Sequence, residues 1–404
     1  MLHISVISED ILHKICKIQE YNYELKCWRK VMTMLVGVPK EIKNHEYRVG
    51  LTPASVNELA KRGHQIIVEK GAGASIDFPD ADYVAAGAEI VISAADIFRR
   101  ADMMVKVKEP QKSECKMLRE GQILYTYLHL APDPAQTALL VQSGATCVAY
   151  ETVTDNMGGL PLLAPMSEVA GRMSVQAGAH HLEKAQGGRG VLLGGVPGVA
   201  PAKVLVIGGG VVGDNAAAMA VGMGADVTIL DRSIPRLREL DAKYEGRARC
   251  VYSTDAAIEQ YALEADLVIG AVLIPGAEAP KLLSHNLVSR MQKGSVVVDV
   301  AIDQGGCFET SRATTHDNPT FVVNDVVHYC VANMPGGVAR TATIALNNAT
   351  LPYALALADD PINALFRDKN LQQGLNVHRG KVTYKAVADT LGYPYVPTDE
   401  ALKA

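Results

Sequence analysis

The sequence predicts an α/β protein with two doubly wound parallel sheets, in which one domain is discontinuous and the other is inserted within it. From Met34 onward, short apolar runs alternate with helical patterns, as expected of parallel strands joined by crossover helices. The chain has 404 residues, which is enough for two domains that each bury a full core. After Asn333 an alanine-rich helical tail offers a single strand-like run, so we expect this tail to pack on the first sheet.

The first α/β unit begins at Met34. Its expected strands are Leu35 to Val38, Gln65 to Val68, Met103 to Val107, Ile123 to Tyr127 and Thr146 to Tyr150, and its expected helices are Pro53 to Arg62, Asp82 to Ala86 and Pro134 to Ser143. A stretch from Ser167 to Ala185 is then expected to form a connecting helix. The tail holds a helix from Arg340 to Leu357 and a lone strand from Val382 to Tyr384.

The second α/β unit lies between those segments. Its strands are expected around Leu205, Val227, Ala265 to Val272, Ser295 to Ile302 and Phe321 to Val323, with crossover helices that begin near Val211, Ile234, Ala256 and Pro280. The expected boundaries are residues 34–161 and 340–404 for the discontinuous domain and residues 162–339 for the inserted domain. A cleft between two such domains is a common ligand site.

A glycine motif in the second unit indicates a Rossmann-like dinucleotide site. Gly208, Gly210 and Gly213 fit the pattern G-x-G-x-x-G directly after an apolar strand. These glycines permit a tight turn, close approach of the backbone to a pyrophosphate, and close helix packing, and the helix N-terminus attracts the phosphates. Asp231 ends the next strand, where its carboxylate can accept hydrogen bonds from the adenine-ribose hydroxyls. The inserted domain is therefore expected to bind NAD in preference to NADP, although Arg232 and Arg236 are near enough to weaken that preference.

Composition excludes several classes of function. The formal net charge is -5, no long basic stretch is present, and no apolar run reaches the length of a membrane helix. We therefore expect no nucleic-acid or membrane partner. The seven cysteines lack metal-ligand spacing and their number is odd, which favours reduced thiols and a cytoplasmic location.

Two segments leave alternatives open. Residues 1–33 show neither strand alternation nor a capped helix, and are either an accessory arm or an upstream extension before a working protein that begins at Met34. We favour the extension and expect it to be dispensable. The glycine cluster from Gly187 to Gly198 lacks the phosphate-binding spacing, so we expect a projecting β-hairpin with a possible role in subunit contact.

An enzyme that moves hydride between a nicotinamide and a small carboxylate substrate needs a cation for the carboxylate, a donor to the carbonyl or imine, and a group that moves protons. The candidates are Arg48, Lys106, Lys108, His129 and Asp303. Most of them stand at or just beyond the ends of apolar runs, where ligands of open α/β sheets bind. Each also has an ordinary structural explanation, as a surface arginine, a solvated lysine pair, a core histidine or a capping aspartate.

Long motifs in this chain resemble those of L-alanine dehydrogenases. They are MLVGVPKEIKNHEYRVGLTP, VKVKEP, LLAPMSEVAGR, QGGRGVLLGGVPGV, ADLVIGAVLIPGAEAPKL, DVAIDQGGCFE and YCVANMPGGV, in that order from Met34 to the C-terminal region. The resemblance implies reversible, NAD-linked oxidative deamination of L-alanine to pyruvate and ammonia, by a homohexamer.

The resemblance also implies roles for individual residues. Arg48 and Lys108 match substrate-binding positions, and His129 and Asp303 match the catalytic pair. The candidate cofactor-contacting residues are Ser167, Gly208, Gly210, Val211, Gly213, Asp231, Arg236, Ser253, Val272, Leu273, Val300, Ala301, Ile302, Asp303, Arg312, Val331, Ala332, Asn333 and Met334.

The chain departs from the family pattern in one respect, and two other functions stay open. Some family members are expected to hold magnesium through an acid and a histidine late in the chain, but Ala356 and Asp360 stand in that region here, so we expect no bound metal. The alternatives are the soluble NAD(H)-binding component of a proton-translocating transhydrogenase and a non-catalytic NAD-binding protein. Retention of Arg48, Lys108 and His129 favours the dehydrogenase.

Overall fold

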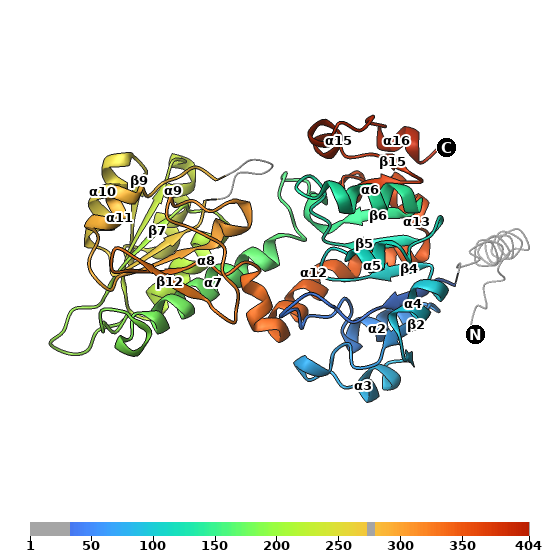
Figure 1. Cartoon of the computed structure of the whole chain (residues 1–404), viewed down its shortest axis with the longest axis horizontal. Helices are drawn as coiled ribbons and strands as arrows, with labels where there is room; N and C mark the ends of the chain where they lie inside the picture. Colours follow the sequence, from blue (N-terminus) through green and yellow to red (C-terminus); the bar gives the residue numbers. More distant parts are fainter. Residues whose placement is uncertain (1–32, 273–278, 404) are drawn as a thin grey trace, which may run out of the picture.

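The computed structural model describes residues 33–272 and 279–403, which form two α/β domains side by side (Figure 1). One domain is built on an eight-stranded sheet of order β15-β14-β6-β5-β4-β1-β2-β3, and the other on a seven-stranded sheet of order β12-β13-β11-β10-β7-β8-β9. The fold class expected from the sequence is therefore confirmed. The residues before 33, which include nearly all of the expected N-terminal extension, lie outside the described part.

The eight-stranded sheet takes strands from both ends of the described chain. Its strands are β1 (Leu35–Val38), β2 (Gln65–Glu69), β3 (Ala88–Val91), β4 (Met103–Val105), β5 (Ile123–Thr126), β6 (Thr146–Ala149), β14 (Leu375–His378) and β15 (Lys381–Val382). The first six are parallel, whereas β14 runs antiparallel to β6, and β15 antiparallel to β14. The sheet is therefore mostly parallel, as expected, with an antiparallel edge at which the tight connection between β14 and β15 leaves no room for a crossover helix.

The helices of this domain are α2 (Pro53–Lys61), α3 (Asp80–Ala85), α4 (Ala94–Arg100), α5 (Lys112–Cys115), α6 (Pro134–Ser143), α13 (Pro361–Arg367), α14 (Lys369–Gln372), α15 (Lys385–Leu391) and α16 (Thr398–Ala401). Successive strand residues enter different cores: Leu124 packs in one apolar cluster and Tyr125 in another. Both faces of the sheet are therefore covered, as the long apolar runs of parallel strands require.

The seven-stranded sheet forms the second domain. Its strands are β7 (Lys203–Ile207), β8 (Asp226–Asp231), β9 (Ala248–Tyr252), β10 (Leu267–Gly270), β11 (Val296–Asp299), β12 (Thr320–Val323) and β13 (Val326–Tyr329), and its helices are α8 (Val211–Gly222), α9 (Ile234–Tyr244), α10 (Asp255–Glu264) and α11 (His285–Arg290). Only β12 is antiparallel to its neighbour. Val204 and Leu205 again enter different cores.

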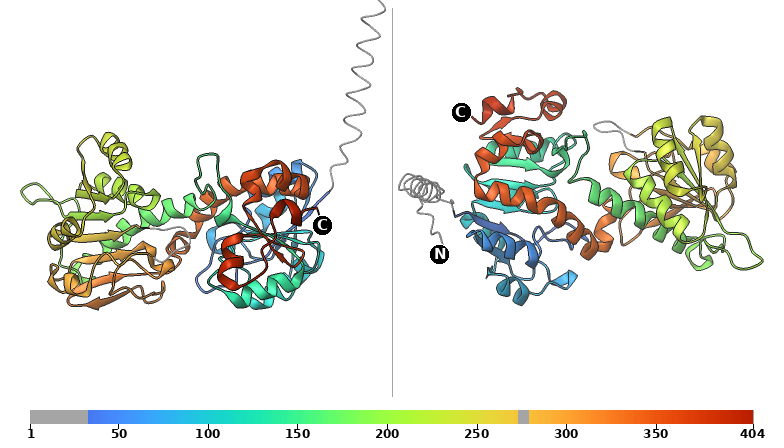
Figure 2. Two further views of the ribbon diagram at one scale, coloured as in Figure 1. Left: turned by 90° about the horizontal axis from the view of Figure 1, so that it is seen from above. Right: turned by 180° about the vertical axis from the view of Figure 1, so that it is seen from behind.

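Two long helices, α7 (Ala164–His181) and α12 (Ala339–Asp359), connect the domains and pack against each other (Figures 1 and 2). α12 also fixes the segment that follows Arg48. The amide of Thr52 donates to Asn347 Oδ1 at 2.8 Å, and the Asn347 side chain also accepts from Ser55 Oγ at 2.9 Å. The C-terminal part of the chain therefore holds the loop after Arg48 in place.

Two local expectations differ from the structure. No helix begins at Pro280; the next helix, α11, starts at His285, where Ser284 caps it through a hydrogen bond from Leu287 N. The glycine cluster forms a projecting loop with one antiparallel bridge, Val196 to Val199, in place of a longer hairpin. Within the two described ranges, no helix combines the length and apolarity needed to cross a bilayer.

Candidate functional site

The glycine loop after β7 has the geometry of a phosphate cradle. Gly208 has φ +102°, which favours glycine, and a Cβ at Gly213 would lie 1.7 Å from the Gly208 carbonyl oxygen. At Gly210, in contrast, an added Cβ would meet nothing within 4 Å, so the backbone there is open to a ligand. Gly210 is the N-cap of α8 and no side chain caps that helix, which leaves its first amides free for an anion. These residues fit a dinucleotide pyrophosphate.

Asp231 ends β8 directly beside this loop. Its Oδ2 accepts from Gly209 N and its Oδ1 accepts from Ser233 N, both at 2.7 Å. These two bonds fix the carboxylate and leave lone pairs for ribose hydroxyls. Ser253 is buried at the end of β9, and its amide donates to the Asp231 carbonyl at 2.9 Å.

Arg236 is held by other groups of the protein. Its Nε donates to the Gly209 carbonyl at 2.7 Å, its Nη2 lies 2.9 Å from Asp214 Oδ2, and its Nη1 lies 2.7 Å from Glu239 Oε2. Burial lowers the pKa of Arg236, but the two carboxylates outweigh it and raise the pKa above its ordinary value. This arginine is therefore less free to receive a 2′-phosphate than its position in the sequence suggests.

The other cofactor candidates lie mainly in segments that follow strands of the same sheet. Val272 follows β10, Val300, Ala301 and Ile302 belong to the 3-10 turn η4 (Val300–Gln304), and Val331, Ala332, Asn333 and Met334 follow β13. Ser167 lies in the first turn of α7, and the guanidinium of Arg312 is stacked 4.3 Å above the Phe321 ring. Leu273 lies outside the described residues.

Arg48 lies in the first domain and is buried. Its Nε donates to Glu46 Oε1 at 2.7 Å, and its Nη2 donates to Glu46 Oε2 at 2.5 Å and to Asn333 Oδ1 at 2.7 Å. Burial raises the pKa of Glu46, but the hydrogen bonds and charge of Arg48 outweigh it, so the pKa of Glu46 lies below its ordinary value. Sequence analysis missed Glu46, although its position two residues before Arg48 was a usable signal.

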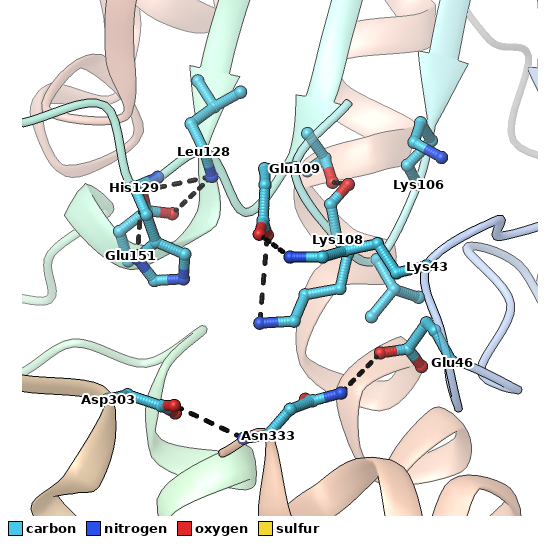
Figure 3. A network of polar contacts seen from close by, with 12 residues as sticks. Lys43, Glu46, Lys106, Lys108, Glu109, Leu128, His129, Glu151, Asp303 and Asn333 are labelled. Carbon is cyan, nitrogen blue, oxygen red and sulfur yellow. Dashed lines mark hydrogen bonds and ion pairs between the residues drawn. The ribbon is translucent and has the colours of Figure 1, made fainter. Parts of the chain in front are cut away.

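Lys108 follows β4 and its amino group points into the space between the domains (Figure 3). Its Nζ lies 3.8 Å from Glu109 Oε2, and Lys43 contacts the other oxygen of the same carboxylate. Burial raises the pKa of Glu109, but Lys108 and Lys43 outweigh it and bring the pKa to about 2. Glu109 is thus a charged partner for Lys108.

Lys106 has the ordinary structural role that the sequence left open. Its side chain is fully buried, turned away from the space between the domains, and it donates to Glu41 Oε2 at 3.1 Å and to Glu114 Oε1 at 2.8 Å (Figure 3). Burial raises the pKa of Glu41, and Lys106 only partly offsets this effect. Lys106 is therefore an internal counter-ion.

His129 follows β5, next to Lys108, and its ring is exposed to the same space (Figure 3). Its φ of 49° is in the left-handed region, which is strained for a non-glycine residue and is typical of functional positions. Glu151 Oε1 accepts from His129 N at 2.7 Å and lies 3.9 Å from His129 Nδ1. The ring also stacks on Tyr127, with an interplanar angle of 6°.

Asp303 approaches from the second domain. It lies in η4, is exposed, and accepts from Asn333 N at 3.3 Å (Figure 3). The Asn333 side chain donates to Glu46 Oε2 at 3.0 Å, so a chain of polar contacts runs from Asp303 to Glu46 and Arg48 across the domains. Side chains separated by many residues in the sequence thus face one space.

Ala356 and Asp360, which stand where metal ligands of the family were expected, belong to helix α12 and to the cap of helix α13. Ala356 lies within α12, and Asp360 caps α13 by accepting from Asn363 N at 3.2 Å. Among the described residues, no group of three or more histidine, cysteine, aspartate or glutamate side chains has a metal-binding arrangement. The absence of a bound metal stays a prediction.

Comparison with known proteins matches both domains to one family. Residues 37–170 match the model for the alanine dehydrogenase/PNT N-terminal domain, and residues 174–385 match the model for its C-terminal domain. An alanine dehydrogenase of Halomonas elongata is 62% identical over 90% of this chain and 98% of its own length. One of Mycolicibacterium smegmatis is 55% identical over 91% of this chain and 99% of its own length.

Solved structures give the same assignment. An L-alanine dehydrogenase structure superposes with a TM-score of 0.87 and 53% identity, covering 89% of this chain and 99% of its own. A transhydrogenase structure from Sinorhizobium meliloti has a TM-score of 0.75 and 26% identity, covering 87% of this chain and 99% of its own. The dehydrogenase is thus the nearer of these two relatives.

Proposed function

This chain belongs to the alanine dehydrogenase/PNT family, and we propose from its site that it is an NAD-dependent alanine dehydrogenase. It catalyses the reversible oxidative deamination of L-alanine: alanine, NAD⁺ and water give pyruvate, ammonium, NADH and a proton. The observation that carries this proposal is that Lys108 and His129 of the first domain face Asp303 of the second (Figure 3). Asp303 follows β11, which belongs to the same sheet as the strand before the glycine loop. NAD⁺ supplies the hydride acceptor for alanine oxidation, and NADH supplies the hydride for the reverse reaction.

Arg48 holds the substrate carboxylate in this proposal. Its planar guanidinium matches two carboxylate oxygens where a lysine offers a point charge. One edge of the guanidinium is already bound to Glu46, and Asn333 Oδ1 accepts from its Nη2. A carboxylate that engages Nη1 and Nη2 together must therefore displace the Asn333 oxygen.

Lys108 donates a hydrogen bond to the carboxylate or keto oxygen of the substrate. Its partner Glu109 is charged and lies 3.8 Å away, which restrains the amino group without a short hydrogen bond. The amino group can therefore turn toward a substrate oxygen and hold the reacting carbon in line for hydride transfer.

His129 and Asp303 move protons at the reacting carbon from opposite walls. The imidazole of His129 carries one ring nitrogen that can donate and one that can accept, so the ring can exchange a proton with the carbinolamine oxygen. Asp303 accepts a proton or orients the incoming ammonia or water. Both side chains are exposed to the space in which the substrate would lie.

A transhydrogenase component is the second candidate. It would bind NAD(H) with the same glycine loop but would need no amino-acid site. The buried Arg48 and the strained His129 argue against it, because transfer of hydride to a partner subunit would use neither residue.

A homohexamer and a cytoplasmic location complete the proposal. The loop after α7 exposes three large apolar side chains, Leu192, Val196 and Val199, which contact with another copy would cover. The cysteine pattern of the sequence supports a reducing compartment. Light scattering that shows only monomer at micromolar concentration would contradict the hexamer.

One assay tests the proposed activity. Purified protein with NADH, pyruvate and ammonium should oxidise NADH, and omission of either pyruvate or ammonium should abolish the reaction. Oxidation that continues without ammonium would contradict the proposed reaction, and NADH binding without any turnover would support one of the two alternatives.

A further inference from the structure

Two neighbouring strands of the eight-stranded sheet end in the same way just before the site. β4 ends at Val105 and β5 at Thr126, and the two strands are parallel neighbours. Lys108 is the third residue after β4, and His129 is the third residue after β5. These two site residues therefore occupy equivalent positions in adjacent strands.

At these positions the backbone amides have passed the end of the strand ladder. Lys106 N still donates to Tyr125 O, and Tyr127 N still donates to Val107 O. The following amides, at residues 107 and 108 and at residues 128 and 129, need other acceptors because a buried amide without a partner is costly.

A glutamate carboxylate supplies the acceptor in both places. Glu41 Oε1 accepts from Val107 N at 2.7 Å and from Lys108 N at 3.2 Å. Glu151 Oε1 accepts from Leu128 N at 3.2 Å and from His129 N at 2.7 Å. In each case one carboxylate oxygen binds two consecutive amides, and the second amide belongs to the site residue.

The two glutamates come from the strands that flank this central pair. The sheet order is β6-β5-β4-β1; Glu41 follows β1, and Glu151 follows β6. Both side chains are largely buried, with 2% of the Glu41 side chain and 13% of the Glu151 side chain exposed. The outer strands therefore supply the carboxylates and the inner strands supply the site residues.

We propose that Glu41 and Glu151 are positioning residues, which fix Lys108 and His129 by binding their backbone amides. This inference rests on the proposed function of Lys108 and His129. Neither glutamate needs to touch the substrate. Glu151 has the larger task, because it also holds His129 in its left-handed conformation. Charge-assisted hydrogen bonds of this kind are about twice as strong as those between neutral groups.

The proposal predicts a different kinetic defect for each glutamate. Glu41→Gln and Glu41→Ala should mainly raise KM for pyruvate and alanine, since Lys108 binds the substrate. Glu151→Gln and Glu151→Ala should mainly lower kcat, since His129 moves protons. We expect about 10- to 150-fold effects for the two alanine variants, as for the loss of a charge-assisted hydrogen bond, and smaller effects for the two glutamine variants, which keep one acceptor oxygen.

Double-mutant cycles separate positioning from a general loss of structure. If Glu151 acts through His129, then Glu151→Ala should lower kcat in the parent and have no further effect in a His129→Ala background. The same relation should hold between Glu41→Ala and Lys108→Ala for KM. Additive effects in both cycles would overturn the proposal.

Glu69 provides a matched control. Its carboxylate also accepts from a backbone amide, Lys40 N at 2.8 Å, but it touches neither site residue. Glu69→Gln should leave both kinetic constants unchanged, and a defect equal to that of the Glu151 variant would count against the proposal.

A measurement without turnover separates this inference from the proposed activity. Labelling of His129 by diethyl pyrocarbonate, followed by mass spectrometry, should be faster in Glu151→Ala than in the parent, and unchanged in Glu69→Gln. An inactive parent with this labelling pattern would refute the activity and support the positioning role. An active parent with equal labelling rates in all three proteins would refute the positioning role.

Discussion

The two walls of the site are built in different ways. The glycine loop and the aspartate of the nucleotide wall come from one continuous stretch, Lys203 to Asp231, in which glycines shape the backbone and one carboxylate closes the loop. The substrate wall comes from separate loops after β1, β4, β5 and β6, and buried charges hold those loops together. Local backbone shape dominates the first wall, and direct hydrogen bonds and ion pairs of buried charged groups dominate the second.

This difference has a practical consequence. A contiguous motif can fail through a single added methyl group, because its atoms already touch. A distributed site fails through the loss of a charge or of a reacting group, and its backbone can survive that loss. Mutations in the two walls should therefore affect different measurable quantities.

The largest effect should come from His129, the residue of the substrate wall that we propose moves protons. His129→Ala should lower kcat roughly 100- to 10,000-fold, the usual contribution of a general acid-base group, while NADH binding stays close to that of the parent. Steady-state kinetics and fluorescence titration with NADH measure the two quantities. His180→Ala, at an exposed histidine on α7, is the control. Near-normal turnover of His129→Ala would mean that His129 has a structural role and no catalytic one.

Arg48→Lys should weaken substrate binding at the same wall. The change removes the guanidinium that binds both Glu46 oxygens, and truncation of a buried charge pair costs about 2 to 5 kcal/mol. We expect a large rise in KM for pyruvate and alanine with little change in NADH affinity. Arg99→Lys, at an exposed i,i+3 ion pair, should have no effect. A rise confined to KM for NADH would instead assign Arg48 to the nucleotide wall.

The contrast between the walls also explains what the sequence could predict. The strand, glycine turn, helix and aspartate of the nucleotide wall follow one another, so their spacing alone identified the site. Strands β1, β4, β5 and β6 were likewise found from their apolar runs. Strands β3, β9, β13 and β14 were missed because polar or turn-forming residues interrupt or flank them.

The partners in the substrate wall left no such local signal. Glu41 and Glu151 each stand after a different strand, and only the sheet order brings them to Lys108 and His129. Family resemblance pointed to the substrate-contacting side chains but gave no account of what holds them. The environment of Lys106, which lies two residues from Lys108 yet is fully buried, could not be distinguished by spacing.

Gly213→Ala should break the nucleotide wall by steric conflict. Its Cβ would lie 1.7 Å from the Gly208 carbonyl oxygen, which forces the loop to shift; overpacking of this kind costs about 1 to 3 kcal/mol. NADH affinity and the melting temperature should both fall. Gly222→Ala in the same helix, where a Cβ meets nothing within 4 Å, should leave both unchanged. Equal behaviour of the two variants would show that the loop tolerates the methyl group.

Asp231→Ser should relax cofactor choice without affecting the substrate wall. Loss of the carboxylate removes ribose hydrogen bonds worth roughly 1.5 to 3 kcal/mol, so the preference for NAD over NADP in kcat/KM should fall about 10- to 150-fold. The gain with NADP itself should be limited, since Asp214 and Glu239 occupy Arg236. Asp226→Ser, at the other end of β8, is the control. An unchanged preference for NAD over NADP in Asp231→Ser would mean that this aspartate does not determine cofactor choice.

The smallest effect should be a pH dependence confined to the substrate wall. The pKa of Glu109 is held at about 2, below its ordinary value of 4.5, and a carboxyl group with a lowered pKa stabilises the fold above its unfolded pKa. This stabilisation is lost as pH falls from about 4.5 toward 2. Glu109→Gln does not titrate, so its free energy of unfolding should fall less than that of the parent between pH 7 and pH 3. Because the Lys43 side chain is partly exposed, we expect a difference of only about 1 kcal/mol. Urea unfolding at both pH values measures it, and Glu58→Gln, at an exposed ion pair, should behave like the parent. Parallel losses in Glu109→Gln and the parent would mean that the charges around Lys108 do not stabilise the fold, and that the two walls differ less in their electrostatics than their contacts indicate.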